Sequence, residues 1–566
     1  MPHYPTRSSL LNMTNRLVLA VSHVTVAGAI NTLIIAALCT HFIFKKWEPM
    51  SIPTVTTLLL VLPMTLSGLL FSHFNTLTAV VCACLIFWTT LITSIVLYRL
   101  SPFHPLARYP GPIQAKISKL WTTWIVSQGR QHLYIEQLHL QYGDIVRIGP
   151  NELSIRDVSA IQALMGSTGW AKGPLWNGRT FHNPKPGLIA LRSNAAHAAQ
   201  RKAWNRAFNT TALKTYEPVI GRRVVQFASA IEAQNGTVDL AQWLSFFTHD
   251  FMCDMAFGGG TEMLRDGDVD GLWQGMKDGL EMSQVYETIP WASYYARYIP
   301  GMAMELKRFR AKCYQRAEQR LVAGSNVKDL LYYLSNEGSE AEETPLRSLA
   351  ISEAVLAVIA GSDTTSSALS STFWCLLRYP NYFKRLQEEV DRYYPSDDDA
   401  LDPKHHPKMV FLDAVLKEVL RLYPAVPSGS QRSAEEGTKG KFIGPYYIPE
   451  GNQARIHFWS VQRDPRNFSD PESFYPDRWL IAEGLLPASK GFVHNPNAYV
   501  PFSFGPANCV GKNLALQEMR ILICYTMQKL TMQFEEGWDP LEWERNLEDR
   551  MVYKTGRLPV IVGKRP

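Results

Sequence analysis

The residue best suited to chemistry is Cys509, which lies in the run FSFGPANCVG at positions 502–511. Gly505 and Pro506 indicate a constrained turn, and a helical pattern begins directly after the cysteine. A thiol at a helix start faces free backbone N–H groups and the positive end of the helix dipole, which favour its thiolate form. A thiolate is the electron-donating axial ligand of one class of haem iron. A buried structural cysteine in a loop is the alternative interpretation.

A short polar run follows an almost wholly apolar segment earlier in the chain. Residues 349–359 are apolar enough, and free enough of helix breakers, to predict a buried helix. The run GSDTT then places Asp363 beside Thr364, although such residues compete with helical backbone bonds. Departures from local rules are expected at functional sites, and a carboxylate beside a hydroxyl can relay protons. A kinked core helix is the other interpretation.

A charged pair lies on another predicted helix, over residues 411–422, whose apolar residues form a stripe at helical spacing. Glu418 and Arg421 are three positions apart and therefore lie on one face. An exposed pair of this kind stabilises little, whereas a buried pair needs further hydrogen bonds to offset its desolvation. Arg478, in the loop sequence FYPDRW (474–479), is a candidate third member. A solvated helix face is the alternative.

Three apolar segments precede all of these motifs. Residues 17–44, 52–71 and 77–97 contain no Asp, Glu, Lys or Arg. Each segment has about the 20 residues that are needed to cross a hydrocarbon core. The first is longer than the apolar core of a cleavable signal peptide, so we expect it to remain as an anchor. The sequence therefore predicts an N-terminal membrane anchor of one to three transmembrane helices within residues 1–100.

The flanking charges predict the orientation of this anchor. Lys45 and Lys46 lie between the first two segments, while the second link, 73–75, has no Lys or Arg. The positive-inside tendency places the lysine pair in the cytosol. Three spans then put everything after Arg99 in the cytosol, as expected at the endoplasmic reticulum. The N-terminus would be luminal, where the sequon at Asn12 predicts a glycoprotein.

The remainder of the chain has the composition of a globular protein. Four prolines in residues 101–112 predict a stiff hinge, and we place the soluble domain at residues 113–566. Of the 566 residues, 46% are apolar and 19% are charged. The net charge of +6 is mild and gives no support for a nucleic-acid partner. The eight cysteines have no zinc-site spacing and favour a reducing compartment over a disulfide framework.

Together, and in this order, the motifs resemble the cytochrome P450 superfamily from about Tyr109 to the C-terminus. The cysteine loop matches the signature F-x-x-G-x-x-x-C-x-G, and GSDTT resembles the oxygen-binding helix of the family. Glu418, Arg421 and Arg478 match its E-x-x-R and P-x-R elements, which are structural there. The sequence YPGP at 109–112 resembles its proline hinge. The resemblance implies a mainly α fold with small β-sheets behind the membrane anchor.

The resemblance also implies roles for particular residues. Cys509 would be the axial ligand of the iron, Phe502 would pack near its sulfur, and Gly511 would allow close approach of the backbone. Thr364 and Asp363 would deliver protons. The contacts to the haem propionates would come from Arg432, His197 and Arg201.

The sequence departs from the family pattern beside the ligand. Two residues before the cysteine the family usually has a basic residue, and here it is Ala507. Losing that guanidinium removes one propionate contact, so we expect lower haem affinity. His197 also replaces the tryptophan that the family often has at this position, which keeps a hydrogen-bond donor but loses stacking area.

The activity implied by the resemblance is that of a monooxygenase with haem b, which inserts one oxygen atom of O2 into a lipophilic small molecule. Electrons would come from NADPH through a membrane-bound cytochrome P450 reductase. The anchor and hinge resemble those of fungal members, many of which act in secondary metabolism, for example on terpenoids. The aromatic segment 286–302 would lie near the substrate entrance, and Ala425, Val426 and Pro427 would line the pocket.

Two other classes of function stay open at this point. One is a haem-thiolate enzyme that rearranges or dehydrates an oxygenated substrate without external O2. The pair Asp363 and Thr364 argues against it, because that chemistry has less need of proton delivery. The other is a non-catalytic membrane haem binder.

Overall fold

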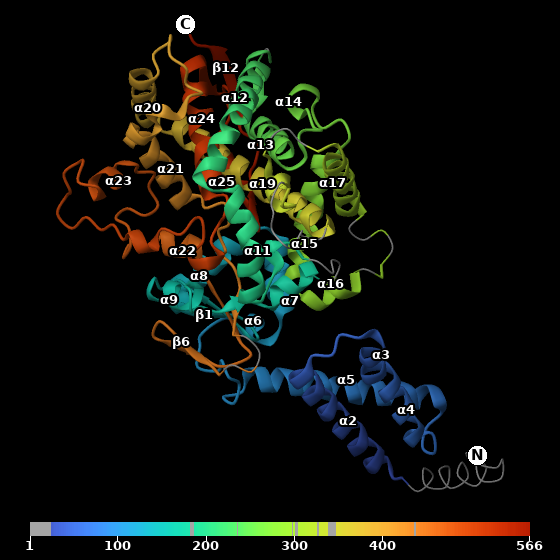
Figure 1. Cartoon of the computed structure of the whole chain (residues 1–566). Helices are drawn as coiled ribbons and strands as arrows, with labels where there is room; N and C mark the ends of the chain where they lie inside the picture. Colours follow the sequence, from blue (N-terminus) through green and yellow to red (C-terminus); the bar gives the residue numbers. More distant parts are fainter. Residues whose placement is uncertain are drawn as a thin grey trace. The chain divides into compact units, whose positions relative to one another are not determined.

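The structure is a computed structural model, shown in Figure 1. It describes residues 24–180, 186–234, 236–296, 298–299, 301, 304–324, 328–337, 347–434, 437 and 439–566. The chain divides into two compact units, Met1–Arg108 and Tyr109–Pro566. Asn12 and the start of the predicted first span lie outside the described residues. The division between the units lies inside the predicted hinge.

The first unit contains three helices that are long and apolar enough to cross a membrane. They are α2 (Val26–Trp47), the segment Ile52–Leu70 and α5 (Thr76–Leu100). The middle segment joins α3 (Ile52–Thr56), a π-helical turn (Thr57–Val61), α4 (Leu62–Leu66) and a 3-10 turn (Ser67–Leu70).

The first helix runs past its apolar segment at the C-terminal end. It includes Lys45 and Lys46, because cations are favoured near the negative end of a helix dipole. The Lys45 ammonium also lies 3.8 Å from the ring centroid of Tyr98 on α5. Small side chains allow α2 and α5 to pack closely, and the buried cluster includes Ala29, Ala37, Ala79 and Ala83.

The second unit is mainly helical, as predicted. Its helices are α6 (Ile113–Ile117), α7 (Lys119–Ser127), α8 (Gln131–Tyr142), α9 (Ser159–Met165), α10 (Asn177–Thr180), α11 (Asn194–Ala207), α12 (Thr210–Glu232), α13 (Leu240–Phe257), α14 (Met263–Asp266), α15 (Leu272–Thr288), α16 (Pro290–Ala296), α17 (Met304–Ala323), α18 (Leu330–Leu334), α19 (Arg347–Arg378), α20 (Pro380–Tyr393), α21 (Val410–Leu422), α22 (Phe458–Gln462), α23 (Asp477–Ala482), α24 (Lys512–Lys529) and α25 (Leu541–Arg545).

Small sheets lie at the margins of this helical unit. The largest sheet contains β1 (Ile145–Gly149), β2 (Glu152–Ile155), β8 (Gln453–Ile456), β5 (Arg432–Ser433) and β3 (Ala171–Lys172), in that order. Strands β2 and β8 are parallel, and the other neighbouring pairs are antiparallel. A second sheet has the order β4 (Thr237–Asp239), β12 (Pro559–Lys564), β9 (Leu530–Phe534). Two hairpins are formed by β6 (Lys441–Ile443) with β7 (Tyr446–Ile448) and by β10 (Glu548–Arg550) with β11 (Val552–Lys554).

Helices α13 and α19 pack against each other through the middle of the second unit (Figure 1). Almost every residue of α13 is buried, as expected of a helix that is surrounded by others. The GSDTT run lies inside the uninterrupted helix α19, where hydroxyl groups donate to carbonyls four residues back; Ser362 reaches Val358 O at 2.6 Å. A Cβ atom at Gly361 would lie 2.6 Å from Sδ of Met252, so glycine permits the close approach of α13.

The predicted ion-pair set is fully buried. Glu418, Arg421 and Arg478 each have a relative exposure of 0%. Arg421 donates to both carboxylate oxygens of Glu418, at 2.8 and 3.0 Å, and Arg478 donates to Oε1 at 3.0 Å. Burial alone would raise the pKa of Glu418, but the two guanidinium groups outweigh it and lower the pKa.

The same carboxylate organises the chain between α22 and α23. It also accepts hydrogen bonds from Nε1 of Trp479 and from the backbone N–H of Tyr475, both at 3.0 Å. Arg421 and Arg478 donate further to backbone carbonyls between residues 462 and 473. Pairing with additional hydrogen bonds is what lets buried charges persist. The set therefore fixes a segment that contains little regular secondary structure.

We expect Glu418→Gln to lower the free energy of unfolding by about 3–5 kcal/mol, because it keeps the shape but leaves two buried guanidinium groups without a counter-charge. The matched control is Glu483→Gln, which removes an exposed partner of Lys417 at 2.8 Å and should cost less than about 1 kcal/mol. Denaturant unfolding of the full-length protein, followed by circular dichroism, measures both. Equal effects of the two substitutions would contradict the structural role of Glu418.

Candidate active site

A cavity of about 320 Å³ lies in the second unit, between α11, α13, α19, β5, the cysteine loop and α24. It brings together most of the residues singled out from the sequence. Those that line it are Cys509, Phe502, Gly511, Arg432, His197, Arg201 and Thr364. Residues more than 300 positions apart therefore meet at one site.

The cysteine loop is a tight backbone structure held by its own hydrogen bonds. Ser503 and Gly505 have φ values of 63° and 72°. A Cβ atom at Gly505 would collide with the carbonyl oxygen of Met165, so this position requires glycine. The backbone N–H of Cys509 donates to the carbonyl of Phe502 at 2.9 Å. The loop thus returns on itself just before α24 begins at Lys512.

Cys509 presents its sulfur to the cavity from the N-terminal end of α24. Protein atoms surround the side chain on all sides except the one that faces the cavity. The exposed surface of Cys509 is therefore part of the cavity wall. Burial raises the pKa of the Cys509 thiol. The neighbouring backbone N–H groups of Gly511 and Lys512 and the charge of Arg201 lower this pKa. These donors are available to stabilise a thiolate.

One end of the cavity gathers basic side chains with little acidic compensation. Arg432 is 3% exposed, and its guanidinium has no hydrogen bond or ion pair with the residues that the structure describes; Nε is a buried donor without a partner. Burial lowers the pKa of Arg432 to about 10. Burial and the charges of Lys172, Arg201 and Arg432 lower the pKa of His197 to about 4. An anionic group with several acceptor oxygens would satisfy these donors.

Arg201 also lies beside the position that lacks the usual basic residue. Its guanidinium donates to the carbonyl oxygen and to Oδ1 of Asn508, at 2.7 and 3.0 Å. Asn508 directly follows Ala507, which also lines the cavity. A positive charge from α11 therefore lies next to the gap that Ala507 leaves.

Sequence reasoning missed Lys172. It is paired with Arg432 across β3 and β5, and its ammonium donates to the carbonyl of Ile189 at 2.6 Å. Only the strand pairing brings this lysine to the cavity, and no local sequence signal indicates it.

Gln462 and Glu518 were also missed. The buried amide of Gln462 donates to the carbonyl of Arg421 at 2.9 Å and accepts from the N–H of Val500 at 2.9 Å, so it links the ion-pair set to the cysteine loop. A glutamine among the apolar residues of α22 was the available signal. Glu518 on α24 lines the cavity, where burial raises its pKa well above the usual range.

The predicted proton-delivery pair is divided between two faces of α19. Thr364 lines the cavity, and its hydroxyl donates to the carbonyl of Ala360 at 2.7 Å. Asp363 is not among the lining residues. Burial raises the pKa of Asp363, and the nearby ammonium of Lys277 on α15 lowers it. The acid is therefore adjacent to the cavity rather than in it.

The remaining walls are apolar. They include Met252, Leu356, Ala357, Ala368 and Phe458. Ala425 and Val426 line the cavity as predicted from the resemblance, whereas Pro427 does not. No described residue of the segment 286–302 is part of the lining, and Trp291, Tyr298 and Ile299 are exposed.

Comparisons with known proteins agree with this arrangement. The family model described as Cytochrome P450 matches residues 110–555. The chain is 33% identical over 449 residues to the cytochrome P450 monooxygenase FCK2 of Fusarium pseudograminearum (strain CS3096), covering 78% of this chain and 79% of that one. It is 31% identical over 524 residues to cytochrome P450 67 of Uromyces fabae, covering 90% and 94%.

Two further similarities bear on function and fold. The chain is 28% identical to tryprostatin B 6-hydroxylase of Aspergillus fumigatus, covering 84% of this chain and 83% of the relative. The solved structure of the cytochrome P450DA heme domain is 20% identical, with a TM-score of 0.63 over 77% of this chain and 92% of that one, and shows the same fold. The motifs, the fold and these relatives agree: the chain belongs to the cytochrome P450 family and is a monooxygenase that uses the haem cofactor of that family.

Proposed function

We propose that this monooxygenase binds haem b with Cys509 as the axial ligand and hydroxylates a lipophilic small molecule in secondary metabolism. The observation that supports this most strongly is the position of the Cys509 sulfur. It faces the cavity beside the N–H groups of Gly511 and Lys512, which favour its thiolate form. The buried guanidinium of Arg432, which has no partner among the described residues, lines the same cavity.

The chemistry of the lining fits an amphiphilic macrocycle with two carboxylates. Arg432, His197 and Arg201 would hold the carboxylates, with Lys172 as a further cation nearby. Phe502 and Leu514 offer apolar surface for the ring. When bound, the haem iron supplies the electron-transfer chemistry that activates dioxygen and oxidises the substrate.

The protein tunes the ligand through its own hydrogen bonds. The N–H groups of Gly511 and Lys512 withdraw electron density from the sulfur, and second-shell hydrogen bonds of this kind adjust the properties of a metal site. Gly511 lies close to the ligand, since a Cβ atom there would be 4.0 Å from Sγ of Cys509. This backbone segment therefore sets how strongly the thiolate donates.

Proton delivery is assigned to Thr364 with Asp363. The Thr364 hydroxyl is at the cavity surface and donates to Ala360 O. When the hydroxyl rotates away from this carbonyl, it can accept a proton on a lone pair and donate its own proton into the cavity. Burial raises the pKa of Asp363, which helps this carboxyl to hold a proton for transfer. The positive charge of Lys277 on α15 lowers the pKa of Asp363 and so limits this increase.

The apolar walls favour a lipophilic substrate, of which a terpenoid is one example. One relative is tryprostatin B 6-hydroxylase of Aspergillus fumigatus, which supports a role in secondary metabolism. The three apolar helices would anchor the protein in the membrane of the endoplasmic reticulum, with the catalytic domain in the cytosol. NADPH–cytochrome P450 reductase in the same membrane would supply electrons.

The test is turnover in membranes that contain the full-length protein and a reductase. Candidate pathway intermediates are incubated with NADPH under isotopically labelled dioxygen, and products are analysed by mass spectrometry. We expect one labelled oxygen atom per hydroxylation. A product that forms without NADPH, or that carries no label, would instead indicate rearrangement or dehydration.

Arg432→Gln should weaken haem retention by at least about tenfold, because it removes a buried charge-assisted donor for a carboxylate. The apoprotein should be no less stable, since the Arg432 guanidinium has no partner among the described residues. Transfer of haem to apomyoglobin measures retention, and thermal unfolding of the apoprotein measures stability. Lys202→Gln, at an exposed position of α11, is the control. An unchanged rate of haem transfer from Arg432→Gln would show that Arg432 does not hold a haem carboxylate.

Asp363→Asn should lower product formation by at least about tenfold, because a proton donor beside Thr364 is lost. It should also increase the solvent isotope effect while the ferrous–CO spectrum stays unchanged. Asp278→Asn, at an exposed position of α15, removes a similar charge without touching α19 and should behave like the original protein. Loss of activity with no change in the isotope effect would argue for a purely structural role of Asp363.

A further inference from the structure

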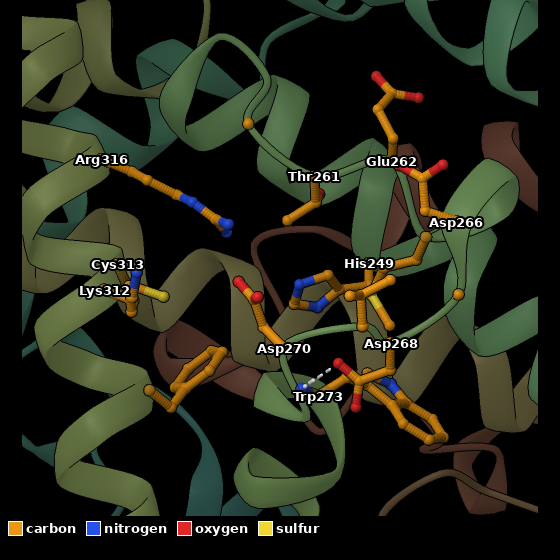
Figure 2. A pocket seen from close by; sticks show the side chains of 15 residues that line it. His249, Thr261, Glu262, Asp266, Asp268, Asp270, Trp273, Lys312, Cys313 and Arg316 are labelled. Atoms are coloured by element: carbon orange, nitrogen blue, oxygen red, sulfur yellow. Dashed lines mark hydrogen bonds between the residues drawn. The ribbon is translucent and has the colours of Figure 1, made fainter.

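A second cavity, of about 280 Å³, lies in the catalytic unit, and Cys509 is not among the residues that line it. Figure 2 shows the side chains of the lining residues. The walls of the cavity are the middle of α13, the segment 260–270 (which includes α14), the start of α15 and the middle of α17. Among the described residues, it shares no lining residue with the first cavity. The role proposed above uses none of its side chains.

His249 places a buried polar atom without a partner against this cavity. It is 3% exposed, and its Nδ1 has no hydrogen-bond partner in the part of the chain that the structure describes. Burial lowers the pKa of His249 to about 4, so the ring is neutral. Its Nε2 lies 3.5 Å from the sulfur of Cys253, and burial raises the pKa of that thiol to about 12.

The thiol decides which ring nitrogen carries the proton. Because Cys253 keeps its proton and an imidazole nitrogen is a better acceptor than sulfur, we assign the thiol as the donor to Nε2. The ring proton is then on Nδ1, which is a donor with nothing to receive its hydrogen bond. A buried donor of this kind favours a ligand that brings an acceptor oxygen.

Opposite charges line two different walls of the cavity. Lys312 and Arg316 lie one turn apart on α17, and neither forms an ion pair with a described residue. The facing segment contributes Asp266, Asp268 and Asp270. Figure 2 shows the guanidinium of Arg316, the ring of His249 and the carboxylate of Asp270 directed into the same space.

The carboxylates of the acidic wall have hydrogen-bond acceptor positions that are not used within the protein. Asp268 receives the N–H groups of Trp273 and Gln274 at 3.1 and 3.0 Å, which leaves further lone pairs. Asp270 is exposed and forms no hydrogen bond or ion pair with another described residue. No group of three or more His, Cys, Asp or Glu side chains in the described part of the chain is arranged to hold a metal ion. The acceptors therefore suit an ammonium group better than a metal.

We propose that this cavity binds a small zwitterion of the α-amino-acid type. Its carboxylate accepts hydrogen bonds from Arg316 and from Nδ1 of His249, and its ammonium group faces Asp268 and Asp270. Its apolar part packs on the buried rings of Phe309 and Trp273. A simple anion would leave the acidic wall opposed by negative charge, and a simple amine would face Arg316.

Matched probes test the charge requirement directly. The full-length, haem-loaded protein is saturated with an azole that blocks the first cavity and is then titrated calorimetrically. The probes are L-phenylalanine, 3-phenylpropanoate and 2-phenylethylamine, which differ in their charged groups. We expect saturable binding of phenylalanine and at least about tenfold weaker binding of the other two.

Variants assign the two charged groups of the probe to the two walls. Arg316→Gln should weaken phenylalanine binding by at least about tenfold, and Lys307→Gln, at an exposed position of α17 outside the cavity, should not. Asp270→Asn should weaken phenylalanine but not 3-phenylpropanoate. An unchanged ferrous–CO spectrum shows that each variant is folded.

Three results would overturn the proposal: no saturable binding of phenylalanine, equal binding of all three probes, or equal affinity in the Arg316 variant and the Lys307 control. None of these bears on the first cavity, because the azole occupies it throughout. A failure of this site and a failure of the proposed monooxygenase chemistry are therefore separate outcomes.

Discussion

The buried carboxylate of Glu418 is the constraint on which the catalytic unit depends. Two guanidinium groups, an indole N–H and a backbone N–H converge on its two oxygens, and the guanidinium groups in turn hold carbonyls of the segment that follows α22. Removing three charged groups from water is costly, and only this complete set of partners offsets the cost. The sequence between α22 and α24 has little regular structure, so these side chains take the place of a helix or sheet ladder.

A short series of hydrogen bonds connects the Glu418 ion-pair set to the position of the cysteine sulfur. Gln462 joins the last turn of α21 to Val500, Phe502 receives the N–H of Cys509, and α24 begins immediately afterwards. The sulfur then meets the N–H groups at the helix start. On another wall, Arg432 keeps a buried positive charge without an acceptor among the described residues. A protein that leaves buried donors unsatisfied gives up stability, and this loss is expected where a ligand supplies the missing acceptors.

The parts that the sequence predicts well are those determined by local chemistry. The glycines and the cysteine of residues 502–511 indicate a turn before a helix, and the apolar run before Asp363 indicates a buried helix. Both elements are present, and the mainly α fold with small sheets is confirmed. The family assignment is confirmed as well, because its motifs combine identity with order along the chain. The roles of the individual site residues stay predictions, although most of these residues meet in one cavity.

The parts that sequence reasoning missed depend on long-range geometry. Lys172 reaches the cavity only because β3 pairs with β5, and Arg201 lies next to Ala507 only through its bonds to Asn508. The separation of Asp363 from the cavity depends on how α19 is rotated against α13 and α15, which hydrophobic pattern alone does not fix. The charged walls of the second cavity come from the segment 260–270 and from α17, and no sequence motif unites them.

Ligation of the iron by Cys509 is the central claim, and the ferrous–CO spectrum of the haem-loaded full-length protein tests it most directly. Thiolate ligation predicts the absorption band shifted to long wavelength, and Cys509→His should move it to the position typical of imidazole ligation while haem is retained. An unshifted band in the original protein, or a shifted band that survives Cys509→His, would contradict the account.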